Sequence, residues 1–235
     1  MDRKNINVVL VHGAWADGSS WRDVIGPLGA AGMNVVAAPL PLTSLRDDVA
    51  ALERTIERLD GPVVLVGHAY AGAVIGEARS EKVRALVYVA ALAPDEGEVV
   101  ADVFYRNEPH PLAPKLAPDA HGLIWLPRDA FASAFAQHAS PTTCDWLAAV
   151  QRPIAVPCIS TPVGSPRWKD VPTWYLLAED DRMIRKETQA FMAERMNATV
   201  VAHPVDHAPS VSAPKVVVDI ILAAANAVAN TAKGD

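Results

Sequence analysis

The chain has 235 residues, of which 51% are hydrophobic and 20% are charged, and its formal net charge is −6. This length and apolar content suit one domain with a large core, and they exclude a disordered chain, a collagen and a solenoid. The acidic balance argues against a dedicated nucleic-acid-binding protein, and two cysteines, Cys144 and Cys158, exclude a disulfide framework and a four-cysteine zinc site.

No segment indicates targeting to, or insertion into, a membrane. The first apolar run ends at His12 and is too short for the core of a signal peptide, and no apolar run approaches the ~18 residues that span a bilayer. We therefore expect a cytoplasmic protein that binds no membrane and acts on a small-molecule substrate as a monomer or a homodimer.

Valine-rich runs alternate with segments of helical spacing through the first 94 residues. Because strands that alternate with helices pair in parallel, we expect a parallel sheet with the functional site beyond the carboxyl ends of its strands. In chain order, the predicted elements are a strand at 7–11, a helix at 19–31, a strand at 34–38, a helix at 45–59, a strand at 62–66, a helix at 70–79 and a strand at 85–91.

The alternation stops after Pro94 and resumes near residue 172. The intervening segment is rich in proline and contains scattered aromatic residues and short helical pieces such as 128–137 and 143–150, which we interpret as a lid; a second half of the core is the alternative. The sequence thus predicts one domain made of a first core half (1–94), an inserted lid (95–171) and a second core half (172–235). The elements expected in the second core half are a strand at 173–177, a helix at 185–196, a strand at 198–202 and a helix at 213–228.

The segment Val64–Gly72, VLVGHAYAG, has the form of a nucleophile elbow. In this motif, G-x-S-x-G, a serine lies on a sharp turn between a strand and a helix, and small residues are needed because the two elements approach closely. Ala69 stands where the motif has serine. The elbow is therefore predicted, but its nucleophilic oxygen is absent.

Acidic residues and a histidine follow the elbow in the order of a hydrolase triad. Asp180 and Asp181 come after the predicted strand at 173–177, and His207 comes after the last predicted strand. In such a triad the histidine is the general base and the acid orients it. Either aspartate can be that acid. The backbone N–H groups after His12-Gly13 and at Tyr70 are candidate donors to an oxyanion.

The sequence resembles the small α/β-hydrolase-fold esterases of bacteria, which are related to the plant methylesterase and hydroxynitrile lyase branch. The resemblance covers nearly the whole chain and rests on VLVHGAWADGSSW, VVLVGHAYAGAVI, LVYVAALAPDEGE, QRPIA, WYLLAEDDRMI and HAPSVSAP. It implies an α/β-hydrolase fold with a minimal, mostly parallel sheet of about six strands, helices on both faces and an inserted helical lid. It further implies Ala69 at the nucleophile position, Asp181 as the acid, His207 as the base, and Ala14 and Tyr70 as the oxyanion donors.

The expected activity is hydrolysis of a small, fairly apolar ester or lactone by Ser-His-Asp acyl transfer. Ala69 interrupts that reaction and is either an engineered change or a natural loss. Two other functions stay open. The Asp181–His207 base and the oxyanion hole could serve a lyase or isomerase, or the chain could be a pseudoenzyme that binds a ligand.

The remaining candidates concern substrate contacts and cofactors. Trp15, Trp125 and Trp146 are the predicted substrate-binding residues, with packing as the alternative, and His12 and His68 are expected to support loops near the site. There is no glycine-rich dinucleotide motif after a strand, no phosphate-binding loop and no cluster of metal ligands. We therefore predict no cofactor and no metal.

Overall fold

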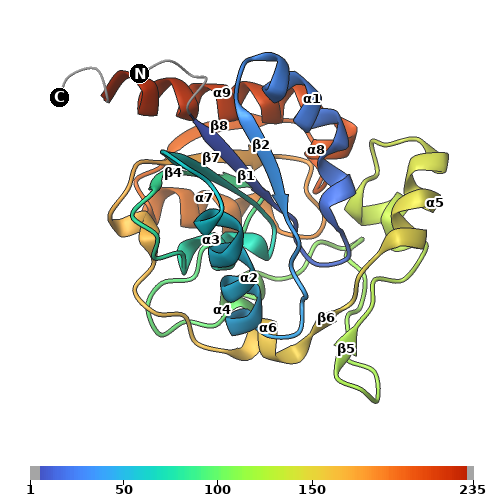
Figure 1. Ribbon diagram of the computed structural model, residues 1–235. Helices are drawn as coiled ribbons and strands as arrows, with labels where there is room; N and C mark the ends of the chain where they lie inside the picture. Colours follow the sequence, from blue (N-terminus) through green and yellow to red (C-terminus); the bar gives the residue numbers. More distant parts are fainter. Residues whose placement is uncertain (1–5, 232–235) are drawn as a thin grey trace.

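The computed structural model describes residues 6–231 as an α/β protein built around one sheet of six strands (Figure 1). The spatial order of the strands is β2-β1-β3-β4-β7-β8, and every neighbouring pair is parallel, which confirms the predicted pairing. The ends of the predicted strands shift by at most two residues. The strands are β1 (Asn7–Val11), β2 (Asn34–Ala38), β3 (Val63–His68), β4 (Val83–Val89), β7 (Thr173–Ala178) and β8 (Thr199–His203).

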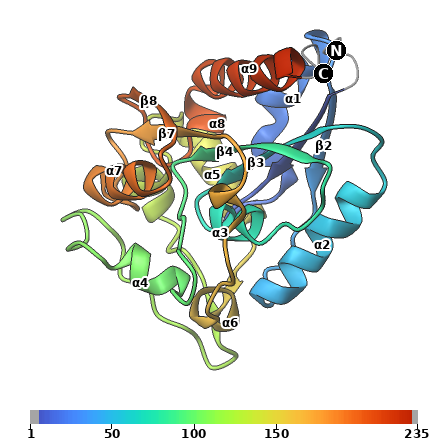
Figure 2. The ribbon, with the colours of Figure 1, turned by 90° about the vertical axis from the view of Figure 1, so that its left-hand side faces the viewer.

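Helices cover both faces of the sheet, with α1 and α9 on one face and α2, α3 and α7 on the other (Figure 2). Because successive side chains of a strand point to opposite faces, Val8 and Leu10 of β1 pack in the layer with α1 and α9, whereas Val9 and Val11 pack in the layer with α2 and α3. The helices of the core are α1 (Arg22–Ala30), α2 (Leu45–Glu57), α3 (Ala71–Gly76), α7 (Lys186–Arg195), α8 (Pro209–Ser212) and α9 (Pro214–Thr231), with a 3-10 turn, η2 (Gly18–Trp21), before α1.

The amphipathic helix predicted at 45–59 is α2, and its first turn is fixed by a side-chain cap. Ser44 lies in an extended conformation and its hydroxyl accepts the backbone N–H of Asp47 at 3.0 Å. The helix predicted at 70–79 is shortened to α3. Within residues 6–231, no helix combines the length and the apolar character that crossing a bilayer requires.

The segment 95–171 lies between β4 and β7 in the chain and contains short elements only. The predicted helix at 128–137 is wrong in length, because only one π-helical turn, η3, forms there. An antiparallel pair of two-residue strands, β5 and β6, was not predicted. Such short pieces carry no readable periodicity. The elements are α4 (Val100–Phe104), β5 (Leu123–Ile124), η3 (Phe131–Phe135), α5 (Pro141–Val150), β6 (Ile154–Ala155), α6 (Val156–Ser160) and the 3-10 turn η4 (Arg167–Lys169).

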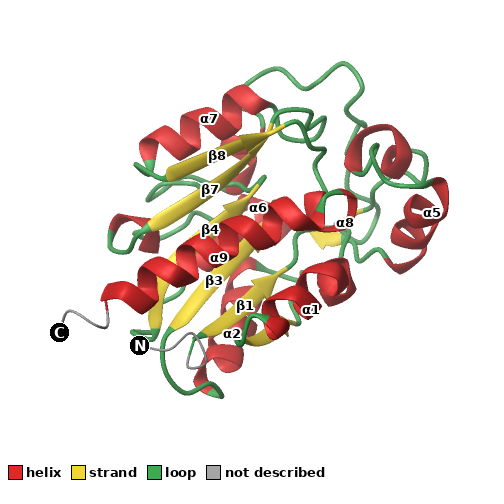
Figure 3. Cartoon of the chain, turned by 90° about the horizontal axis from the view of Figure 1, so that it is seen from above, coloured by secondary structure: helices red, strands yellow, loops and turns green. Residues whose placement is uncertain are grey.

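All six strands point the same way, and their carboxyl ends lie on one side of the molecule. Figure 3 shows the arrowheads directed toward the side that carries α5 and α8. Loops that follow β1, β3, β7 and β8 therefore meet at this edge, where the sequence predicts the site.

The closest backbone approach at this edge is made possible by Gly72, in α3. A Cβ at this position would lie 2.3 Å from the carbonyl oxygen of Leu92, whereas a Cβ at Gly29 of α1 would meet no atom within 4 Å. We predict that Gly72→Ala lowers the free energy of unfolding by about 3 kcal/mol through overpacking. The matched substitution Gly29→Ala should raise it by about 0.5–1 kcal/mol, because alanine reduces the entropy of the unfolded chain.

Urea denaturation of the two variants checks that they change the free energy of unfolding in opposite directions. Equal stability of Gly72→Ala and the unsubstituted protein would contradict the described packing of α3 against the loop after β4.

Candidate active site

Ala69 occupies a strained turn between β3 and α3. Its φ is +50°, in the left-handed region that side chains other than glycine rarely adopt. Its backbone is held on both sides: the N–H donates to the carbonyl of Val89 at 3.3 Å, and the carbonyl accepts the N–H groups of Gly72 at 3.1 Å and Leu92 at 2.9 Å. The predicted elbow geometry is thus present around a residue that carries only a methyl group.

Asp181 and His207, on two different loops, form a buried hydrogen-bonded pair. The Nδ1–H of His207 donates to Oδ2 of Asp181 at 2.8 Å. The other carboxylate oxygen accepts the backbone N–H groups of Met183 at 2.7 Å and Ile184 at 2.8 Å. Gln189, on α7, donates to Oδ2 at 3.0 Å. These donors satisfy both oxygens of the buried carboxylate.

Of the two aspartates that the sequence left as candidates, the structure brings Asp181 to His207. Asp180 is exposed, and its carboxylate lies 3.8 Å from the imidazole of His138 instead. Gln189 was missed by sequence reasoning. It lies on the buried side of α7, between the buried residues Thr188 and Met192. A polar residue on this side was a weak sign that its amide pairs with a buried group.

His68 and His12 support the backbone of the site, as expected. The ring of His68 donates from Nε2 to the carbonyl of His207 at 2.6 Å, and burial lowers its pKa to about 3, so this imidazole is neutral. The ring of His12 accepts the N–H of Leu40 at 3.3 Å through Nε2 and donates to the carbonyl of Gly13 at 2.9 Å through Nδ1. Burial lowers the pKa of His12 as well.

Ala14 and Tyr70 flank Ala69 at the wall of a cavity. Their backbone N–H groups have no hydrogen-bond acceptor among residues 6–231. Gly13 allows the close approach of the two loops, since a Cβ there would lie 2.9 Å from the carbonyl oxygen of His68 and 3.0 Å from the Cβ of Ala69. Two unpaired donors next to an elbow can stabilise a negatively charged oxygen.

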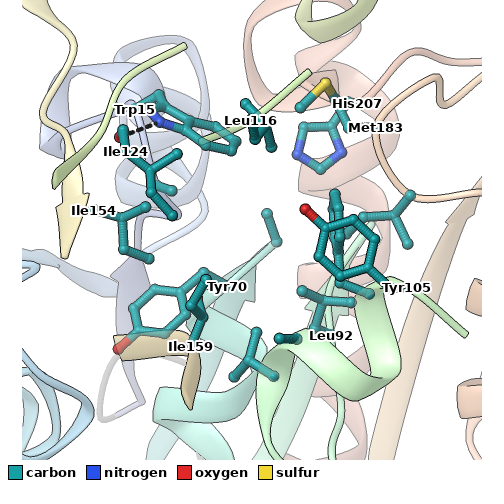
Figure 4. Close-up of a pocket in the computed structure, with 16 residues that line it drawn as sticks. Trp15, Tyr70, Leu92, Tyr105, Leu116, Ile124, Ile154, Ile159, Met183 and His207 are labelled. Carbon is teal, nitrogen blue, oxygen red and sulfur yellow. Dashed lines mark hydrogen bonds between the residues drawn. The ribbon is translucent and has the colours of Figure 1, made fainter. Parts of the chain in front are cut away.

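The cavity encloses about 600 Å³ of empty space, including its open mouth, and none of its sixteen lining residues is Asp, Glu, Lys or Arg. Figure 4 shows the ring of His207 facing Tyr105 and Trp15 across this space. Trp15 has a φ of +57°, and its indole N–H donates to the carbonyl of Ile124 in β5 at 2.9 Å. The segment 95–171 thus supplies much of the apolar wall, including Phe104, Leu116, Ile154 and Ile159.

Of the three tryptophans predicted to contact substrate, Trp15 lines the cavity, and Trp125 and Trp146 do not. Trp125 follows Ile124 in an extended segment, so the two side chains point in opposite directions: Ile124 is buried and Trp125 is 47% exposed. Trp146 lies on α5, where the guanidinium of Arg22 stacks 4.9 Å from its ring centroid. The structure therefore does not bring these two residues to this cavity, and their predicted contact with substrate finds no support there.

The neutral, buried His68 makes the stability of the protein depend on pH. An unfolded histidine has a pKa near 6.5, so the unfolded state binds more protons than the native state between that value and about 3. The contribution of neutral His68 to the free energy of unfolding is complete above the unfolded pKa and is lost as the pH falls. At about pH 5 this loss amounts to about 2 kcal/mol. His68→Gln keeps a donor toward His207 but removes the titrating group. We predict that, between about pH 7.5 and about pH 5, the free energy of unfolding falls by about 2 kcal/mol less in His68→Gln than in the unsubstituted protein.

Urea titrations at both pH values measure this difference. The control His121→Gln replaces an exposed histidine and should retain the pH dependence of the unsubstituted protein. An unchanged slope in His68→Gln would show that another group is responsible.

Comparison with known proteins gives a consistent result. The family described as "Alpha/beta hydrolase family" matches residues 8–220. The chain is similar to alpha/beta hydrolase nvfD of Aspergillus novofumigatus, with 26% identity over 93% of this chain and 96% of the relative. It is also similar to a carbendazim hydrolyzing esterase of Nocardioides sp., with 36% identity over 39% of this chain and 44% of that protein.

Among solved structures, a methylesterase of Arabidopsis superposes with a TM-score of 0.77 and 18% identity, covering 94% of this chain and 99% of that one, which shows a shared fold. The chain belongs to the alpha/beta hydrolase family.

Proposed function

We propose that this chain carries the active site of a carboxylic ester hydrolase that works by Ser-His-Asp acyl transfer, with Ala69 in the place of the nucleophile. The observation that carries the proposal is the left-handed turn at Ala69, whose residue lines the same cavity as His207, the partner of Asp181. Esterase-type relatives support it. A left-handed residue that carries a Cβ costs about 1 kcal/mol, and such strained residues are common at active sites.

With serine at position 69, each remaining group has a role. The serine hydroxyl would attack the ester carbonyl carbon while Nε2 of His207 takes its proton, and Asp181 would stabilise the resulting imidazolium. The N–H groups of Ala14 and Tyr70 would hold the oxyanion. The tetrahedral adduct would expel the alcohol, which leaves with the proton from His207. Water would then hydrolyse the acyl-enzyme by the same steps.

The cavity favours a small, fairly apolar ester or lactone as the substrate. Its wall contains no Asp, Glu, Lys or Arg side chain, and it is formed mostly by aliphatic and aromatic groups. Such a wall gains binding free energy from burying apolar surface and would leave a charged substrate group unpaired. The contacts that we assign to the substrate are those of Trp15, Phe104, Ile154 and Ile159.

Ala69 removes the first step of this reaction. In serine hydrolases, loss of the nucleophile costs roughly a factor of 10⁶ in kcat, and the remaining rate comes from the oxyanion hole and from binding. The chain as it stands should therefore bind esters and turn them over slowly at best.

A second candidate follows from the same geometry. The His207–Asp181 pair is intact and faces a cavity without a nucleophile, so it can act as a base toward a substrate C–H or O–H, as in a lyase or isomerase. A ligand-binding protein without catalysis would have no use for this pair. Ligand affinity that is indifferent to His207→Ala would favour such a pseudoenzyme.

Restoring the nucleophile tests the hydrolase proposal. We predict that Ala69→Ser raises kcat/KM on p-nitrophenyl and methyl esters by about 10³-fold or more, with a burst of alcohol release, because only the missing oxygen limits the reaction. Adding His207→Ala should return the activity to that of the unsubstituted chain.

The matched control is Ala101→Ser, which adds a hydroxyl to the cavity wall on α4 and should not raise the activity. Failure of Ala69→Ser on every ester would refute acyl transfer and leave the proton-transfer candidate, which is then tested with C–H acids in the unsubstituted chain.

A further inference from the structure

Asp48 is a buried carboxylate that the reaction above does not use. It lies on α2, its side chain is fully buried, and among residues 6–231 no basic side chain forms an ion pair with it. Burial raises the pKa of its carboxyl, and the hydrogen bonds that it accepts act in the opposite direction. A group that is costly to bury and far from solvent calls for a structural or functional reason.

The first partner of Asp48 is the residue after the elbow. The hydroxyl of Tyr70 donates to Oδ2 of Asp48 at 2.7 Å. Figure 4 shows the ring of Tyr70 along the cavity wall with its hydroxyl turned away from His207. The phenol therefore points out of the cavity, to an anchor behind it, while the backbone N–H of the same residue is free of an acceptor among residues 6–231.

The second set of partners comes from the other cavity wall. Oδ1 of Asp48 accepts the N–H of Leu42 at 2.7 Å, and Leu42, whose φ is +59°, accepts at its carbonyl the N–H of Ala155 in β6 at 3.0 Å. The thiol of Cys158 in α6 lies 3.6 Å from Oδ2. Burial and the nearby Asp48 raise the pKa of Cys158 to about 12, so the thiol stays protonated and can donate.

These contacts join three parts of the site at one carboxylate. Ala155 follows Ile154, and Cys158 precedes Ile159, and both isoleucines line the cavity. Through Tyr70 the same carboxylate holds the first turn after the elbow. A loss of Asp48 would thus release the oxyanion side and the β6–α6 wall together.

We propose that Asp48 is a positioning residue that fixes the Tyr70 backbone N–H in the oxyanion hole through the Tyr70 hydroxyl, and holds the β6–α6 wall of the cavity against it. The expected effect of Asp48 on the reaction rate rests on the proposed function. Its expected effect on the backbone rests on the hydrogen bonds alone. At the oxyanion hole the effect is on orientation, so we expect a loss in the transition state. Release of the β6–α6 wall, which carries Ile154 and Ile159, is expected to weaken substrate binding as well.

The structure offers a matched control. Tyr88 has a fully buried hydroxyl with no hydrogen-bond partner among residues 6–231, so Tyr88→Phe removes the same atom as Tyr70→Phe without removing a hydrogen bond. Asp48→Asn keeps an oxygen that can accept the N–H of Leu42, but an amide NH₂ replaces the carboxylate oxygen that accepts the hydroxyl of Tyr70. Tyr70→Phe is the milder change and keeps the test available where Asp48→Asn does not fold.

The first readout is independent of catalysis. In the unsubstituted Ala69 chain, labelled with ¹⁵N, we follow the amides of residues 42 and 73, which donate to Oδ1 of Asp48 at 2.7 Å and to the carbonyl of Tyr70 at 3.0 Å. We expect Asp48→Asn and Tyr70→Phe to speed hydrogen exchange at both by about tenfold or more, and Tyr88→Phe to leave it unchanged. Unchanged exchange at both residues in both variants overturns the proposal, whatever the enzyme assay shows. An Ala69→Ser protein without esterase activity would refute the proposed function and leave this readout intact.

The second readout uses Ala69→Ser as the parent. Tyr70→Phe should lower kcat by about tenfold to a hundredfold with KM within about twofold, and Asp48→Asn should lower kcat by a similar factor and raise KM as well, because it also loosens the β6–α6 wall. The kcat of the double variant should fall little below that of the weaker single variant, since both changes reach the oxyanion hole through one hydrogen bond. Tyr88→Phe should retain the parent kcat. Faster exchange with an unchanged kcat, or multiplicative losses in the double variant, would show a purely structural role and overturn the proposal.

Discussion

The backbone reversal at Ala69 is the constraint on which the rest of the site depends. A chain that leaves the end of β3 and enters α3 within two residues must place one residue in the left-handed region, and here that residue is not glycine. The turn is tolerated because its neighbours are small. At Gly13, Gly67 and Gly72 an added Cβ would come within 3.0 Å of a backbone atom. The side chain at position 69 is thereby presented to the cavity at the carboxyl edge of the sheet.

Two buried carboxylates then complete the site around that turn, and each is paired. Asp181 receives donors from a histidine, a glutamine and two backbone amides, and Asp48 receives a phenol, a thiol and a backbone amide. Half-paired carboxylates in an apolar interior would cost several kcal/mol each. The network therefore specifies one arrangement of the loops, and the unpaired N–H groups of Ala14 and Tyr70 stand out as the donors left for a ligand.

Much of this arrangement follows from the sequence, for identifiable reasons. Runs such as Asn7–Val11 are long enough and apolar enough on both faces to predict parallel strands, and the order of elbow, acid and histidine predicts which loops meet. The choice between Asp180 and Asp181 depends on the direction of a side chain in a turn, which spacing alone does not fix. In the structure it is Asp181 that accepts a hydrogen bond from His207.

The parts that could not be predicted lie in the segment 95–171 and on the buried faces of helices. Two-residue strands have no period, and the inward or outward direction of Trp125 depends on the register of β5. Asp48 carried a readable signal that was missed. It falls three residues after Leu45 and four before Leu52, on the buried face of α2.

The most direct test of the central claim, that only the nucleophile oxygen is missing, is covalent labelling with a fluorophosphonate followed by intact-mass and peptide mass spectrometry. The account predicts one adduct in Ala69→Ser, located at residue 69, none in the unsubstituted chain and none when His207→Ala is added. An unlabelled Ala69→Ser protein, or an adduct located elsewhere in the chain, would contradict it.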